Sequence, residues 1–221
     1  MQESITTITL TLPLGMGSVN CYLIDTGAGY ILIDTGGSNT REKLVKELEK
    51  AGCRPGLLKL IILTHGDFDH TGNAAFLRLL FDTRIAMHAA DAGMVQQGDM
   101  FFNRKKPNFI IRKLIPLFTG FRKSDRFDPD ILIDERFDLS QNGLQAKIIK
   151  LPGHSKGSIG ILTFEGNLFC GDQFENTKGP QLTTLIDDSR AILASAASLV
   201  DEKISTVYPG HGKPFTMKDL G

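Results

Sequence analysis

The run His65-Gly66-Asp67-Phe68-Asp69-His70 places four imidazole or carboxylate side chains within six residues, directly after an apolar segment at 57–63. The apolar segment predicts a buried strand. Successive side chains of a strand point to opposite faces, whereas a loop leaving the strand can turn all four side chains inwards. Imidazole and carboxylate together form a mixed nitrogen and oxygen ligand set for zinc, iron or manganese. The run therefore predicts a metal site at the end of a strand.

Three further candidate ligands stand beside glycines near the ends of predicted strands: His154, Asp172 and His211. Sharp turns at strand ends are where α/β proteins place reactive groups. Four of the five histidines of the chain fall in such turns, so a fold that gathers the turns would assemble a metal centre. The fifth, His88, has no glycine turn or candidate ligand beside it, and we expect it to be a structural or surface histidine.

Hydrophobic periodicity predicts an α/β protein, a class that suits a chain of 221 residues with 41% hydrophobic residues. We expect one domain spanning residues 1–221, with an insertion at approximately 98–128. Predicted strands lie at 5–12, 19–24, 30–33, 57–63, 84–87, 131–137, 145–150, 158–164, 167–170 and 205–208. Predicted helices lie at 41–51, 73–81, 88–97 and 189–200.

The segment 101–126 differs from the rest of the chain. It holds eight basic residues and one acidic residue, a local charge of +7 in a chain of zero net charge, interleaved with aromatic and aliphatic side chains. It is either a lid whose cations attract an anionic substrate or an amphipathic segment with a solvated basic face. A nucleic-acid partner is not favoured, because the segment lacks a glycine-rich or regularly stacked aromatic pattern.

The chain shows no sign of export. Its first residues, 1–4, have no basic start followed by an apolar run, and no stretch of about 18 apolar residues predicts a membrane span. Cys21, Cys53 and Cys170 are odd in number and lack metal-type spacing. They indicate buried thiols in a reducing compartment, so we expect a cytoplasmic protein. The oligomeric state is left open.

Five segments in this order resemble the metallo-β-lactamase fold hydrolases, and in particular glyoxalase II-like metallo-hydrolases: 33–36, 64–72, 153–154, 171–172 and 209–212. The resemblance implies a four-layer αβ/βα sandwich with two metal ions at one edge, between two sheets. By position, His65, Asp67 and His154 would hold the first metal, Asp69, His70 and His211 the second, and Asp172 would bridge them. Asp34 would either orient a ligand from behind the metals or cap the turn at 35–37.

One position departs from the resemblance. The usual run is His-x-His-x-Asp-His, and this chain has Asp67 in place of the second histidine. Flavodiiron proteins and domains of DNA-uptake channel proteins are similar in carrying a carboxylate there. With two divalent ions and one hydroxide, the usual ligands leave a net charge of about +1, and this set leaves about zero, so we expect weaker activation of water. The shorter Asp67 would bind the first metal either fully or only loosely.

The resemblance implies a hydrolase that directs a metal-bound hydroxide at a small ester, thioester or lactone, with Asp69 orienting the hydroxide or moving a proton. Two divalent ions are expected, zinc foremost, with iron or manganese as alternatives. A phosphodiesterase or nuclease acting on an anionic substrate is the first alternative function. A diiron redox protein is the second, although such a protein normally needs a flavin domain, for which 221 residues leave no room.

Overall fold

Two β-sheets lie face to face in the computed structural model, which describes residues 4–104 and 121–220. The first sheet has the order β1-β2-β3-β4-β5-β6, with strands Ser4–Thr11, Ser18–Asp25, Tyr30–Ile33, Leu58–Ile62, Ile85–His88 and Ile131–Ile133. The second has the order β10-β9-β8-β7, with strands Gln181–Leu182, Asn167–Asn176, Ile159–Thr163 and Ala146–Lys150; β11, Thr206–Gly212, pairs with β9.

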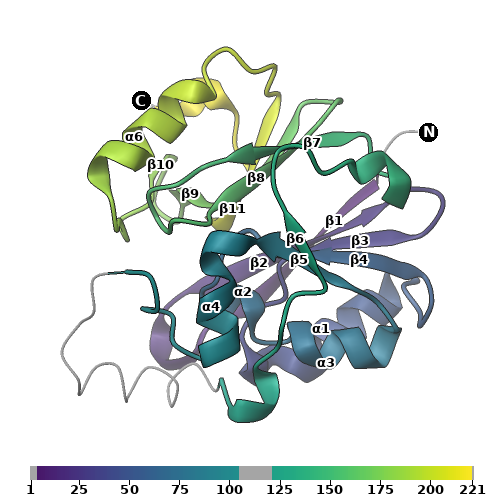
Figure 1. The fold of residues 1–221 in the computed structure, drawn as a ribbon. Helices are drawn as coiled ribbons and strands as arrows, with labels where there is room; N and C mark the ends of the chain where they lie inside the picture. The colour runs from purple at the N-terminus through teal and green to yellow at the C-terminus, as the bar shows by residue number, and fades with distance from the viewer. Residues whose placement is uncertain (1–3, 105–120, 221) are drawn as a thin grey trace.

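Helices cover the outer faces of both sheets (Figure 1). Helices α1 (Arg41–Lys50) and α3 (Ala74–Phe81) lie against the first sheet, and α6 (Ser189–Ser198) lies against the second. Helices α2 (Phe68–Thr71) and α4 (Ala89–Gln97) follow β4 and β5. The result is the α/β sandwich with two sheets that the sequence predicted.

Strands with apolar side chains on both faces produce these layers. In β2, Cys21 and Leu23 join the cluster beneath α1 and α3, while Tyr22 and Ile24 join the cluster between the sheets. In β9, Phe169 packs between the sheets, and its neighbours on either side face the cluster that includes residues of α6 and the C-terminal segment. Because side chains of a strand alternate, a strand that is apolar on both faces joins two layers of core.

The parallel strands β3, β4 and β5 end at the same edge of the first sheet, where Asp34, His65 and His88 are found. His88 accepts a hydrogen bond from the backbone N–H of Ala90 at the start of α4. The expectation that His88 is structural is therefore confirmed.

Three strand ends differ from the predicted ends by four residues or more. Strand β6 ends at Ile133 instead of continuing to 137, because the Asp134 side chain accepts a hydrogen bond from the backbone N–H of Arg136 and forms a turn. Strands β9 and β11 continue past their expected ends at 170 and 208. Two candidate ligands predicted in loops thus lie within strands, next to register shifts between β9 and β11.

The predicted insertion falls mostly outside the described residues, since 105–120 belong to no described segment. Of its flanks, Phe121 is buried and its ring stacks on that of Phe68, with centroids 4.1 Å apart. Whether the segment forms a lid stays a prediction. Among the described helices, none is long and apolar enough to cross a membrane.

Candidate metal centre

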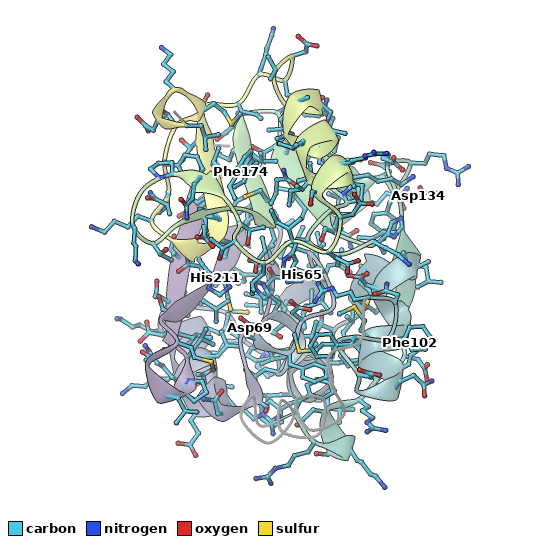
Figure 2. The ribbon with its side chains drawn as sticks, turned by 90° about the vertical axis from the view of Figure 1, so that its left-hand side faces the viewer. His65, Asp69, Phe102, Asp134, Phe174 and His211 are labelled. Carbon is cyan, nitrogen blue, oxygen red and sulfur yellow. The ribbon has the colours of Figure 1, made fainter. Side chains whose placement is uncertain are left out.

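The seven predicted ligands come from four separate parts of the chain. His65 follows β4, and Asp69 and His70 lie in α2. His154 lies between β7 and β8, whereas Asp172 and His211 lie in β9 and β11. Figure 2 shows His65, Asp69 and His211 near the middle of the molecule, between the two halves of the sandwich. The fold therefore gathers residues up to 146 positions apart, as the sequence analysis expected.

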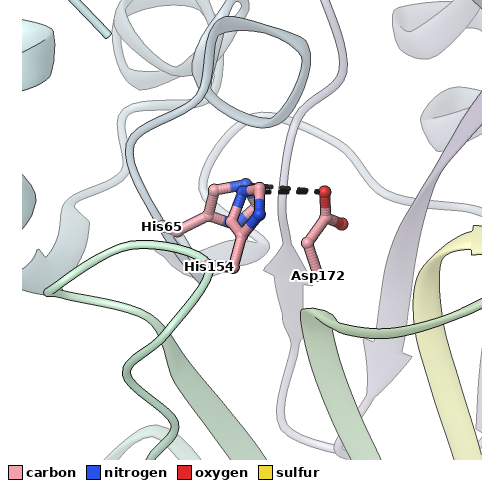
Figure 3. A group of neighbouring side chains, drawn as sticks. All are labelled: His65, His154 and Asp172. Atoms are coloured by element: carbon pink, nitrogen blue, oxygen red, sulfur yellow. Dashed lines mark ion pairs between the residues drawn. The ribbon is translucent and has the colours of Figure 1, made fainter. Parts of the chain in front are cut away.

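His65, His154 and Asp172 form the first group, in which one ligand atom of each residue lies within 4.8 Å of the others. The Nε2 atoms of His65 and His154 lie 4.0 and 3.8 Å from Asp172 Oδ2 (Figure 3). All three side chains are buried.

Asp69, His70 and His211 form the second group within the same distance limit. Asp172 reaches this group as well, because its Oδ1 lies 3.3 Å from His70 Nε2 and its Oδ2 lies 3.3 Å from His211 Nε2. The Asp172 carboxylate therefore lies between the two groups, where a bridging ligand would stand.

Several buried atoms in the centre lack hydrogen-bond partners among the described residues. They are His65 Nε2, His70 Nε2 and Asp172 Oδ1. A buried polar atom without a partner is costly, and these three atoms belong to the two groups of candidate ligands, where a metal ion would satisfy them. Imidazole nitrogen and carboxylate oxygen are donors suited to zinc or iron, so the residues present fit two metal ions.

Charges inside the centre oppose one another. Burial lowers the pKa of His70 and of His211, but Asp172 and other carboxylates outweigh it, raising the pKa of His70 well above its usual range and that of His211 to about 9. Burial raises the pKa of Asp172, yet His211 and His70 hold it well below its usual range. Positive charge is thus already favoured beside Asp172, where divalent ions would displace protons.

His65 differs from these two histidines. Burial, together with the neighbouring rings of His70 and His154, holds the pKa of His65 well below its usual range. Its Nδ1 lies 2.9 Å from the Thr64 hydroxyl. A neutral imidazole with Nε2 free to accept is the form that binds a metal.

Asp67 lies beside the first group but is held from the other side. Its Oδ2 is 3.0 Å from His154 Nε2 and 3.7 Å from His65 Nε2, whereas its Oδ1 accepts a hydrogen bond of 2.6 Å from Arg104. Burial raises the pKa of Asp67, but Arg104 and His154 lower it far more, so it lies well below its usual range. One oxygen is therefore available to a first metal. From sequence alone, Arg104 is one of the basic residues of the segment 101–126, and its contact with Asp67 is not expected.

Asp34 holds the ligands from behind. Its Oδ1 accepts a hydrogen bond from the backbone N–H of Thr64, and its Oδ2 lies 2.7 Å from the Thr64 hydroxyl and 2.8 Å from His70 Nδ1. Of the two roles expected for Asp34, the geometry supports the one that orients a ligand. Its backbone is left-handed, at φ 59°, a conformation that Asp tolerates better than most residues.

A second buried carboxylate was missed. Asp91 in α4 accepts hydrogen bonds from the backbone N–H groups of Gly66 and Gly157 at 3.1 and 2.8 Å. It also accepts bonds from the Ser155 hydroxyl and from the Asn103 amide. Asp91 thus ties the loops of His65 and His154 to each other. Its only signal in the sequence is that it is the lone charged residue of a helix made otherwise of apolar and amide residues.

His211 is fixed by contacts between the two sheets. Its Nδ1 lies 2.7 Å from the Ser18 backbone carbonyl at the start of β2. Asn20 of β2 donates to the backbone carbonyls on both sides of His211, those of Pro209 and Gly212. A Cβ on Gly210 would overlap the Asp172 carboxylate, so the close approach of β11 to the centre requires glycine there.

A pocket of about 370 Å³ opens onto the second group. Asp69, Asp172 and His211 contribute to its wall, together with Asp67 and Glu175. Its apolar lining includes Leu12, Pro13, Met16, Met100 and Leu185. Among the described residues that line it, there is no Lys or Arg. The described part of the pocket therefore favours a neutral, partly apolar molecule next to the candidate metal positions.

Residues 14–211 match the model of the metallo-beta-lactamase superfamily. The chain belongs to this superfamily and is a metallo-hydrolase-like member with His/Asp metal-binding groups. It is 30% identical over 210 residues to a probable metallo-hydrolase of Methanocaldococcus jannaschii, covering 89% of this chain and 88% of that protein.

Two further relatives and one solved structure differ in the share of each chain that is covered. The chain is 29% identical to the hydroxyacylglutathione hydrolase GloC of Haemophilus influenzae, over 73% of this chain and 69% of the relative. It is 26% identical to a beta-lactamase-like protein 2 homolog of Caenorhabditis elegans, of whose length it spans 58%. A crystal structure of a protein in a di-iron-bound form has a TM-score of 0.73 and 27% identity, with 96% of this chain and 95% of that chain covered.

Proposed function

We propose that this chain is a metal-dependent hydrolase that cleaves a small carboxylic ester, thioester or lactone. The observation that carries the proposal is the convergence of two His/Asp groups that share Asp172, with Asp69, Asp172 and His211 on the wall of a partly apolar pocket. A neutral acyl group suits a pocket whose described lining combines apolar, acidic and neutral polar residues and includes no Lys or Arg. The superfamily and its metallo-hydrolase relative support hydrolysis as the reaction class.

The metal ions and the Asp69 carboxylate have separate roles in the proposed reaction. Bound metal ions would activate a water molecule and polarise the carbonyl oxygen of the acyl group that the water attacks. Asp69 lines the pocket, and its Oδ2 lies 3.5 Å from His211 Nε2. Burial raises the pKa of Asp69 above its ordinary value, against the opposing effect of His70 and His211. The Asp69 carboxylate is therefore placed to orient the water and to hold the proton that the water gives up.

The metal pair is proposed as zinc, with iron as the first alternative. Imidazole and carboxylate ligands suit both ions, and three carboxylates among seven ligands favour the harder iron more than a histidine-rich set would. The di-iron form of the relative that is 27% identical supports testing iron beside zinc.

Purified protein would first be loaded separately with zinc and with iron, and its metal content measured. A panel of a neutral aryl ester, a lactone, an acyl-glutathione thioester and bis(p-nitrophenyl) phosphate would then be assayed. The name of the GloC relative favours including the thioester. We expect metal-dependent hydrolysis of at least one carboxylic substrate at a rate far above that of the phosphodiester.

A matched pair of histidine variants controls the assay. His154→Ala removes a member of the first group, whereas His88→Ala removes a histidine that caps α4 and lies outside both groups. The first is expected to abolish hydrolysis and the second to preserve it. Equal activity in both variants, or a protein that neither retains nor rebinds metal, would contradict the proposed function. Cleavage of the phosphodiester alone would instead favour the nuclease class.

A further inference from the structure

Arg104 places a positive charge directly against a candidate metal ligand. We propose that Arg104 and Asp67 act as one neutral unit, in which Arg104 cancels the charge of Asp67 and turns its Oδ2 towards the first metal position. Arg104 is then a positioning residue of the centre and not part of a lid. This inference rests on the metal centre of the proposed function and assigns a role that the ligand set alone does not contain.

The geometry of the pair separates the two carboxylate oxygens. Arg104 donates to Asp67 Oδ1, while Oδ2 lies 3.0 Å from His154 Nε2 and 3.7 Å from His65 Nε2. One oxygen is thus committed to the guanidinium and the other to the first group. An aspartate fixed in this way offers a single oxygen ligand in a set orientation.

Burial shows that the pair is not a surface contact. The side chains of Arg104 and Asp67 are 8% and 5% exposed. An ion pair at this depth loses so much hydration that it adds little to stability in comparison with apolar residues. Its presence beside a candidate metal site therefore points to a role in the charge and geometry of that site.

The position of Arg104 is itself supported by the residues that hold the centre. The neighbouring Asn103 donates from its amide to Asp91 Oδ1 at 3.0 Å. The same Asp91 carboxylate accepts hydrogen bonds from the loops of His65 and His154. The segment that carries Arg104 is thus attached to the same buried anchor as the first group, so Arg104 and the ligands are positioned together.

Charge counting gives the consequence. Asp67, Asp69 and Asp172 bring three negative charges to two divalent ions. With Arg104 at 2.6 Å, the Asp67 unit is as neutral as an imidazole would be, and the centre keeps a net positive charge after a hydroxide binds. If Asp67 were replaced by a neutral ligand, Arg104 would lose its closest carboxylate, keep only the weaker influence of Asp91 and Asp187, and repel the first metal.

A double-mutant cycle tests this inference through metal affinity. Asp67→His, Arg104→Met and the combined variant would be compared with the unmodified protein in zinc-buffered solutions, with bound zinc and the absorption of bound cobalt as readouts. We expect Asp67→His to weaken binding at the first site by about tenfold or more while Arg104 is present. Adding Arg104→Met should recover most of that loss.

Two further variants keep the result interpretable. Arg104→Lys retains the positive charge, so adding Asp67→His to it should still weaken zinc binding at the first site. This comparison stays valid even if Arg104→Met lowers the stability of the protein. Arg78→Met removes a cation paired with Asp130 at 3.3 Å, outside both metal groups, and should rescue nothing. If Asp67→His changes zinc affinity equally with and without Arg104, the neutral unit is refuted. If the unmodified protein binds no metal, the proposed function fails, and this inference fails with it.

Discussion

The two ligand groups share Asp172 but differ in their access to solvent. The side chains of His65 and His154 in the first group are 0% and 2% exposed. In the second group, Asp69 and His211 are 25% and 19% exposed, and both line the pocket. The two histidines of the first group are thus enclosed by protein, whereas Asp69 and His211 of the second group face the space where a substrate would enter.

This difference in solvent exposure indicates that the two metal positions have different roles. An enclosed site retains its ion, since ligands and metal exchange slowly where water and chelators have little access. An open site can exchange its ion and can contact substrate. We therefore expect the first metal to be held as a fixed part of the structure and the second to meet the reacting group, although both depend on the same Asp172 carboxylate.

The largest effect is expected where the two groups meet. Asp172→Ala removes the carboxylate whose oxygens lie 3.3 Å from His70 and His211 and 3.8 Å from His154. Both metals should be lost or weakened by at least about 100-fold, because a direct ligand of each site disappears. Elemental analysis after dialysis would measure the loss. Retention of one full equivalent would show that Asp172 serves a single site.

Removing one histidine from each group should separate the sites. His211→Ala should leave about one metal ion per chain that a chelator removes slowly, and His154→Ala about one that it removes quickly. In the unmodified protein, release should have two phases, the faster one belonging to the second group. Stopped-flow mixing with a coloured chelator would follow both phases. A single phase, or the opposite order, would contradict the comparison of enclosed and open groups.

Much of the centre could be predicted from the sequence, because metal ligands are limited to a few residue types and here they stand next to recognisable glycine turns. His65, His154 and His211 stand beside glycines and strand ends, and the structure brings them together as expected. The strands followed from short apolar runs, as in β2, whereas the two-sheet sandwich was implied by the resemblance to the metallo-β-lactamase fold hydrolases. Hydrophobic periodicity reflects local burial, so it identifies the strands and the side chains of each strand that are buried.

The supporting residues could not be predicted in the same way. Arg104 and Asp91 act through contacts 37 and 25 residues distant in sequence, and nothing local distinguishes them from a surface arginine or a helix aspartate. The predicted ends of β9 and β11 were also wrong, because the continuation of these strands depends on a register shift between segments that are distant in sequence. Such features depend on tertiary pairing, which periodicity does not describe.

A smaller effect is expected at the anchor behind the first group. Asp91→Asn keeps the shape of the side chain but replaces an acceptor oxygen with an NH₂ group, which faces N–H donors such as those of Gly66 and Gly157. The free energy of unfolding should fall by about 1–3 kcal/mol, the cost of leaving buried donors unsatisfied, with metal lost first from the first group. Urea unfolding would measure it. Asp138→Asn, at an exposed turn, should change stability by no more than about 0.5 kcal/mol.

An effect of comparable size, confined to the second group, is expected at Asp34. Its Oδ2 accepts the hydrogen from His70 Nδ1, which leaves Nε2 free for a metal. In Asp34→Asn, the new NH₂ group can take either of two positions. In one it faces the donor N–H of Thr64, and in the other it faces His70 and favours the tautomer whose hydrogen is on Nε2, the atom that a metal would need. Metal affinity at the second group should fall by about 10–100-fold, while the first group retains its ion. Asp82→Asn is the matched control, because Asp82 has a similar left-handed backbone, at φ 51°, but belongs to neither group. Competition with a chelator at known free zinc would measure both variants, and an equal loss from the two groups would show that Asp34 supports the centre as a whole.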